Sequence, residues 1–154
     1  CNDIDPQKAE LAGLLHDCAK CLTNEKRIQI CEKHNIEINA AEQKNPFLLH
    51  AKVGAYQAEA KYDIHDEDIL GAIRWHTTGK PEMTMMEKIV FIAVYIEPCR
   101  THSSRLPELR KLAFRDIDAA LVEILKDTLQ YLQTTNTEID PMTKQTYDYY
   151  TTGI

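Results

Sequence analysis

Helical spacing of apolar residues is the feature that most constrains the fold of this chain. Between residues 6 and 20, Ala12, Leu15 and Ala19 recur every three or four positions, so they share one face of a helix. The same spacing returns along the chain, and no segment alternates apolar and polar residues as a half-buried strand does. Without repeats or low-complexity linkers, the 154 residues are expected to form one domain, 1–154, with a compact all-α bundle fold.

Capping residues and prolines indicate where the helices begin. Asp5 and Asp140 each precede a proline, which pairs an N-cap side chain with the residue preferred at the first helical position. Thr84 and Glu87 form a capping-box pattern before the most apolar helix. We therefore expect helices over 6–20, 24–34, 47–61, 66–76, 88–96, 107–114, 117–133 and 141–150, and a partly looped segment over 35–45.

Composition excludes several classes of protein. The net charge of −6 argues against a general nucleic-acid binder, which is usually basic. No run of 18 apolar residues is present, so no membrane span is expected. The five cysteines are odd in number and scattered, which is unlike a disulfide scaffold and fits a reducing cytoplasm. Cys18 and Cys21 lack a second pair for zinc, so they are interpreted as reduced thiols.

A histidine and an aspartate stand side by side in an apolar run, at His16 and Asp17. Burying an unpaired carboxylate is unfavourable, and one bound metal ion would satisfy both side chains, since imidazole and carboxylate are ordinary ligands of iron, manganese and zinc. The alternative is a helix in which a backbone carbonyl satisfies His16 and Lys20 pairs with Asp17. For the dipeptide alone, that alternative is the more common arrangement.

Two further histidines, His50 and His76, also lie in apolar helical settings. Taken singly, each is better explained as a histidine that bonds a backbone carbonyl or lies at a helix end. Residues of the kind that bind phosphate lie near this set in the sequence, namely Lys20, Arg74, Thr77, Thr78, Gly79 and Arg100. Thr77 to Gly79 could equally be an ordinary helix stop, because glycine is common just past a helix end.

Five segments in order resemble a known family: LAGLLHDCAK, NPFLLHAKVGAYQA, DEDILGAIRWHTTGKPEMTMMEKIVFIA, YIEPCR and LRKLAFRDIDAAL. Together they are similar to the HD-domain metal-dependent phosphohydrolases. More narrowly, they resemble the YqeK-type symmetrical bis(5'-nucleosyl)-tetraphosphatases, which cleave diadenosine tetraphosphate into two ADP. The resemblance implies an α-helical HD bundle with two divalent metal ions. Iron is the metal usually described for the family, with manganese or another transition metal as alternatives.

The resemblance also assigns roles to individual residues. It makes His16 and Asp17 metal ligands, with Asp17 bridging two ions. It makes His50 and His76 ligands of the second ion. Asp17 and Lys20 are the implied catalytic residues, and Lys20 would also contact phosphate. The implied substrate-binding residues are Lys20, Thr77, Thr78, Gly79 and Arg100. Two metals can clamp a phosphoryl oxygen and lower the pKa of a bound water towards neutrality.

Two departures from the family pattern bear on activity. The family has a further histidine on a helix upstream of the HD pair, and this sequence begins too late to contain it. Val94 stands where the family has a metal-binding aspartate, just before the tyrosine of YIEP. Valine cannot coordinate a cation. We expect metal binding to survive through His16, Asp17, His50 and His76, with reduced activity.

Three readings of function therefore remain open at the level of sequence. The first is symmetrical hydrolysis of dinucleoside tetraphosphates. The second is a weakened HD domain that binds a nucleotide without turnover, and the third is an HD phosphohydrolase for other nucleotides, since a fold does not fix a function. The aromatic cluster Tyr147, Tyr149 and Tyr150 is expected to pack within the chain, with a homodimer as the alternative.

Overall fold

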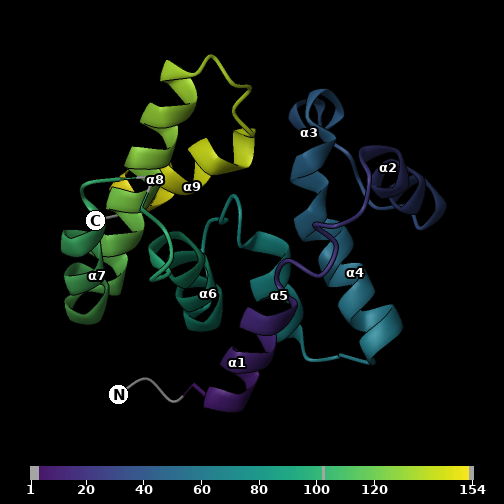
Figure 1. Cartoon of the computed structure of the whole chain (residues 1–154), viewed down its shortest axis with the longest axis horizontal. Helices are drawn as coiled ribbons and strands as arrows, with labels where there is room; N and C mark the ends of the chain where they lie inside the picture. The colour runs from purple at the N-terminus through teal and green to yellow at the C-terminus, as the bar shows by residue number, and fades with distance from the viewer. Residues whose placement is uncertain (1–3, 102, 153–154) are drawn as a thin grey trace.

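Helices make up all the regular secondary structure in the part of the chain that the computed structural model describes, residues 4–101 and 103–152. This confirms the all-α prediction (Figure 1). The segments are α1 (Pro6–Leu15), α2 (Asn24–Lys33), α3 (Ala40–Lys44), the 3-10 helix η1 (Pro46–Leu49), α4 (His50–Tyr62), α5 (Glu67–Trp75), α6 (Met85–Ile96), α7 (Leu106–Arg115), α8 (Ile117–Thr134) and α9 (Pro141–Thr152).

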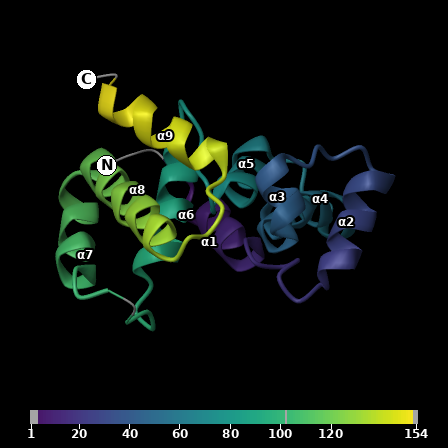
Figure 2. The same ribbon diagram turned by 90° about the horizontal axis from the view of Figure 1, so that it is seen from above.

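The helices form three groups, a central one and one on each side of it. In Figures 1 and 2, α1, α5 and α6 occupy the middle, α2, α3 and α4 lie on one side, and α7, α8 and α9 lie on the other. Helix α5 packs against both α4 and α6, and α6 packs in turn against α8. Each group has its own buried cluster, represented by the fully buried side chains of Ile73 in the centre, Leu49 beside α2 and Leu121 on α8.

The predicted helix starts are confirmed where a cap was recognised. The Asp5 side chain accepts a hydrogen bond from the Gln7 backbone at the start of α1. Thr84 and Glu87 form both halves of the capping box at α6, although the helix begins directly after Thr84, at Met85, rather than at residue 88. The segment 35–45 is only partly a loop, because its second half forms the short helix α3.

Two further predicted boundaries are wrong, and both affect the positions of the candidate ligands. The first helix ends at Leu15 rather than near Lys20, because short turn bonds replace the helical ladder: the Cys18 amide donates to the Leu15 carbonyl at 3.0 Å, and the Lys20 amide to the Asp17 carbonyl at 2.9 Å. The third helix begins with a 3-10 turn, and its α-helical part starts at His50.

Gly54 allows three parts of the molecule to meet. A β-carbon at this position of α4 would lie 3.4 Å from the Ile73 side chain, 3.5 Å from the His16 carbonyl oxygen and 3.7 Å from the Cys18 sulfur. The missing side chain of Gly54 therefore permits this close backbone approach. The close packing brings the residues after α1 against α4, one turn away from His50.

The cysteine and tyrosine predictions have clear outcomes. Cys18, Cys21, Cys31 and Cys99 are free thiols, and Cys1 lies outside the described residues. No helix in the described part of the chain is both long and apolar enough to cross a membrane. The side chains of Tyr147 and Tyr150 pack on the cluster around Leu121, and the Tyr150 hydroxyl accepts a hydrogen bond from the Met83 amide at 2.8 Å.

We expect the substitution Gly79→Ala to destabilise the protein by about 2–4 kcal/mol, measured by urea unfolding. Gly79 has a φ of +65°, and an added β-carbon would lie 2.8 Å from the Thr146 side chain and 3.2 Å from the Met83 sulfur. The matched control is Gly13→Ala in α1, where nothing lies within 4 Å, and it should leave stability unchanged or raise it slightly. Equal stabilities of the two variants would contradict this packing.

Candidate metal centre

Three histidine rings are held in the same way. In each, Nδ1 lies 2.6–2.7 Å from the backbone carbonyl oxygen three residues earlier; the pairs are His16 with Gly13, His50 with Phe47 and His76 with Ile73. A carbonyl oxygen can only accept a hydrogen bond, so Nδ1 must carry the proton. In the neutral form of such a ring, the Nε2 atom is then left with a lone pair, which is the form that binds metals.

These lone pairs converge on Asp17. The Nε2 atoms of His50 and His76 are 3.2 Å apart, and they lie 3.4 Å and 3.6 Å from the same oxygen, Oδ1 of Asp17. Three electron-rich atoms at these separations repel one another unless a cation lies between them. Two imidazoles and one carboxylate on a common centre form a donor set suited to a transition metal, with bonds of ~2.0–2.2 Å. The residues present therefore fit a metal ion.

The other carboxylate oxygen of Asp17 faces different partners. Oδ2 accepts a hydrogen bond from the Lys20 ammonium at 2.8 Å, and it lies 3.3 Å from Nε2 of His16. The His16 ring packs edge-on against the His76 ring, with centroids 5.0 Å apart. Asp17 thus divides its two oxygens, one toward the His50 and His76 pair and one toward His16 and Lys20.

Burial and charge set the protonation states of the candidate ligands Asp17 and His50. Burial is the main reason that the pKa of His50 is lowered to about 4, and the neighbouring His76 lowers it further. Burial raises the pKa of Asp17, but its interactions with His76 and Lys20, the second of them a hydrogen bond, outweigh burial and hold that pKa below its ordinary value. Near neutral pH, His50 is therefore neutral and Asp17 is ionised, so neither must lose a proton to bind a cation.

The cluster opens on a cavity of about 850 Å³. Its walls include Asp17, His50 and His76, together with four other positions singled out from the sequence: Lys20, Thr77, Val94 and Arg100. Thr78 and Gly79 do not line it. Thr78 faces a separate cavity of about 260 Å³, and its hydroxyl donates to the Gly79 carbonyl at 2.9 Å.

Several cavity residues were missed by the sequence analysis; they are Phe47, Tyr95, Arg105, Asp127, Thr128 and Tyr131. Arg105 forms ion pairs with Asp127 and, at 2.6 Å, with Glu123, so it joins the loop before α7 to α8. The only available signal was a pair of polar residues, Asp127 and Thr128, beside the apolar stripe of a long helix. Such residues are ordinarily read as the solvated face of a helix.

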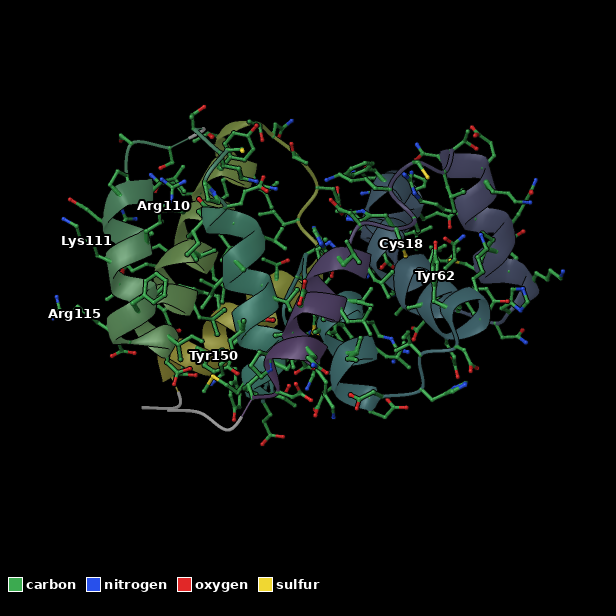
Figure 3. The ribbon with its side chains drawn as sticks, turned by 60° about the horizontal axis from the view of Figure 1, so that its bottom comes forward. Cys18, Tyr62, Arg110, Lys111, Arg115 and Tyr150 are labelled. Atoms are coloured by element: carbon green, nitrogen blue, oxygen red, sulfur yellow. The ribbon has the colours of Figure 1, made fainter. Side chains whose placement is uncertain are left out.

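The loop that carries Arg100 is anchored by Arg110 of α7. Arg110 donates to the carbonyl oxygens of Ile96 and Glu97 at 2.8 Å each, and to that of Arg100 at 3.3 Å. Figure 3 shows Arg110 and Cys18 toward opposite ends of the molecule. The Arg100 guanidinium pairs with Glu97 at 3.1 Å. The cavity therefore takes cationic side chains from the segment after α1, through Lys20, and from the loop between α6 and α7, through Arg100 and Arg105.

Comparison with known proteins agrees with this arrangement. Residues 2–99 match the family model of the HD domain. A Bacillus subtilis protein named symmetrical bis(5'-nucleosyl)-tetraphosphatase is 40% identical over 97% of this chain and 79% of its own length. A protein of the same name from Halalkalibacterium halodurans is 42% identical over 94% of this chain and 76% of its own length.

A solved structure supports the same grouping. It is described as a predicted HD superfamily hydrolase involved in NAD metabolism from Clostridium acetobutylicum. It superposes with a TM-score of 0.93 at 39% identity, and the match covers 97% of this chain and 79% of that one. On the family match, the relatives and the shared fold, this chain belongs to the HD-domain family.

Proposed function

We propose that this chain is a metal-dependent hydrolase that cleaves diadenosine tetraphosphate symmetrically into two ADP. The observation that carries the proposal is the convergence of Asp17, His50 and His76 on the wall of a cavity that also carries Lys20 and Arg100. The names of the Bacillus and Halalkalibacterium relatives support the choice of substrate. Addition of one water to the central phosphoanhydride of this substrate gives two ADP and no other nucleotide.

In this proposal, Asp17, His50 and His76 hold one divalent metal ion. His16 and the second oxygen of Asp17 contribute to a second ion, and iron is the favoured metal, with manganese as an alternative. When bound, such ions supply a water of lowered pKa and polarise phosphate oxygens. The second position has weaker support, since Lys20 already bonds the Asp17 oxygen on that side at 2.8 Å.

The side chains around the metal centre bind and orient the phosphates. Lys20 and Arg100 place positive charge on the cavity wall, where it offsets the charge that develops on the phosphate oxygens and on the departing ADP. Thr77 adds a hydroxyl to the same wall. The polyphosphate is then fixed in line with the attacking water, and such positioning accounts for much of phosphoryl-transfer catalysis.

Val94 favours a second candidate, a weakened nucleotide-binding HD domain. Its apolar side chain lines the cavity, where a carboxylate would add a ligand and a negative charge. Product analysis separates the candidates. With diadenosine tetraphosphate and either Fe²⁺ or Mn²⁺, we expect ADP as the sole nucleotide product. Binding without product would favour the weakened domain, and AMP with ATP would favour a different hydrolase.

The setting of the activity is also a proposal. We place the protein in the cytoplasm, where its four described cysteines would stay reduced as the free thiols observed. The net charge of −6 fits a small nucleotide bound through local cations better than a nucleic acid partner. A homodimer through the tyrosine cluster would depend mainly on Tyr149, which is 41% exposed while Tyr147 and Tyr150 pack on the core.

His50→Ala should abolish hydrolysis of diadenosine tetraphosphate while leaving the helical content nearly unchanged. The substitution removes one of the three converging ligands, and we expect metal bound per chain to fall with activity. Both can be followed by metal analysis and circular dichroism. The matched control is His65→Ala, which removes an exposed histidine that bonds the Asp63 carboxylate. Full activity in the His50→Ala variant would contradict the ligand assignment.

Metal-free protein should lose stability as the pH falls from about 6.5 to about 4. In this window the unfolded chain protonates His50 while the folded chain, with a pKa of about 4, does not, so the unfolded state binds more protons. We expect a loss of ~2 kcal/mol between pH 7 and pH 4.5, measured by urea unfolding. The variant His50→Gln should lack this part of the slope, and an identical pH profile would contradict the assignment.

Val94→Asp should raise the metal bound per chain and the rate of ADP release. An aspartate here would add a carboxylate to the wall of the cavity that Asp17 also lines, and it would offer the second cation a further ligand. The measurements are metal analysis and product release under saturating Mn²⁺. Val94→Asn, similar in size but uncharged, is the control. A gain of equal size in both variants would argue against the missing carboxylate as the cause.

A further inference from the structure

Arg27, on α2, is a buried cation with an unusual set of partners. Arg27 is 2% exposed to solvent. No carboxylate of the described chain lies within ion-pair distance of it. A buried charge is unfavourable unless hydrogen bonds compensate it. The groups that accept hydrogen bonds from Arg27 should therefore indicate which segments this side chain holds in place.

The edge of the Arg27 guanidinium binds the turns that carry Asp17. Nη2 donates to the Lys20 carbonyl oxygen at 2.7 Å, and Nε makes a longer contact of 3.4 Å to the Ala19 carbonyl oxygen. Nη1 donates to the Asn24 side chain at 2.7 Å, which fixes the guanidinium relative to its own helix. Backbone–backbone bonds hold this segment in short local turns, and the bonds from Arg27 tie it in addition to α2.

The face of the same guanidinium packs on the segment that carries His50. Its central carbon lies 5.2 Å from the centroid of the Phe47 ring, a cation–π contact. Phe47 is joined to His50 twice. Its carbonyl oxygen accepts the Nδ1 hydrogen bond at 2.7 Å, and its ring lies 4.9 Å from the His50 ring. Through Phe47, Arg27 therefore reaches the carbonyl that orients one of the converging imidazoles.

We infer that Arg27 is a positioning residue that fixes Asp17 and His50 relative to each other, so that both can bind one cation. The inference rests on the proposed metal site. Arg27 contacts neither ligand directly, and it acts through the Lys20 carbonyl on one side and the Phe47 carbonyl and ring on the other. Groups that orient metal ligands from behind typically change metal affinity by ~10–100-fold when removed.

The chemistry of the side chain explains why an arginine serves here. A guanidinium has donors around its edge and a flat face that stacks on an aromatic ring, so one side chain can bond one segment and pack on another at the same time. A lysine would keep the charge, but its compact ammonium lacks the planar edge and face. Arg27→Lys therefore tests the geometry separately from the charge.

The experiment is a titration of metal-free protein with Co²⁺ alone, followed by calorimetry and by the visible absorption of the bound ion. Arg27→Lys and Arg27→Met should weaken Co²⁺ binding by ~10–100-fold and shift the absorption bands, because the ligand separation changes. Cys31→Ala is the matched control. It removes a fully buried side chain one turn further along α2, so it should lower thermal stability without changing Co²⁺ affinity or spectrum.

Each outcome decides a separate point. If the wild-type protein binds Co²⁺ and folded Arg27→Lys binds it equally well with the same spectrum, the inference is overturned and the proposed function stands. If Arg27→Met fails to fold, Arg27→Lys alone decides. A loss of Co²⁺ affinity in Cys31→Ala equal to that in Arg27→Lys would show a general effect of destabilisation and overturn the inference. If the wild-type protein binds no Co²⁺, the metal site itself fails, and this inference with it.

Discussion

The hydrogen bond from each histidine Nδ1 to the backbone carbonyl three residues earlier is the interaction on which the site depends. It sets the tautomer of His16, His50 and His76 and leaves each Nε2 atom with a lone pair. For His50 and His76, those lone pairs lie 3.2 Å apart beside a carboxylate. The arrangement is unfavourable without a cation and favourable with one. Backbone geometry thus prepares a donor set before any ligand arrives.

Helix ends make this arrangement possible. The carbonyls of Gly13 and Ile73 belong to the last turns of α1 and α5, where the helical ladder leaves carbonyl groups free to accept side-chain bonds. Gly54 then lets the residues after α1 approach α4 closely enough for Asp17 to reach His50. The bundle brings helix termini from distant parts of the sequence to one cavity, and the helix interiors supply the buried clusters that hold them there.

Spacing and caps predicted most of the fold because those signals are local. The starts at Pro6, Ile117 and Pro141 follow from the residues beside them. The end of α1 at Leu15 could not be predicted from neighbouring residues. The turns that follow it are held by a hydrogen bond from Arg27 and by packing on Gly54, and both contacts are visible only in three dimensions. A helical pattern alone could not show that the ladder breaks there.

The candidate site likewise contains residues that the sequence predicted and residues that it did not. Asp17, His50 and His76 were picked from family-like motifs, and the structure brings them together. Thr78 and Gly79 belong to the same motif but turn away from the cavity, because a run of adjacent residues at a helix end points in several directions. Arg105 lines the cavity from the loop before α7 and Asp127 lines it from α8, and no local pattern distinguishes them from surface charges. The most direct test of the central claim is anomalous diffraction from crystals loaded with Mn²⁺. The account predicts a peak within bonding distance of Asp17 Oδ1 and of the Nε2 atoms of His50 and His76. Loaded crystals with no peak among these three atoms would contradict it.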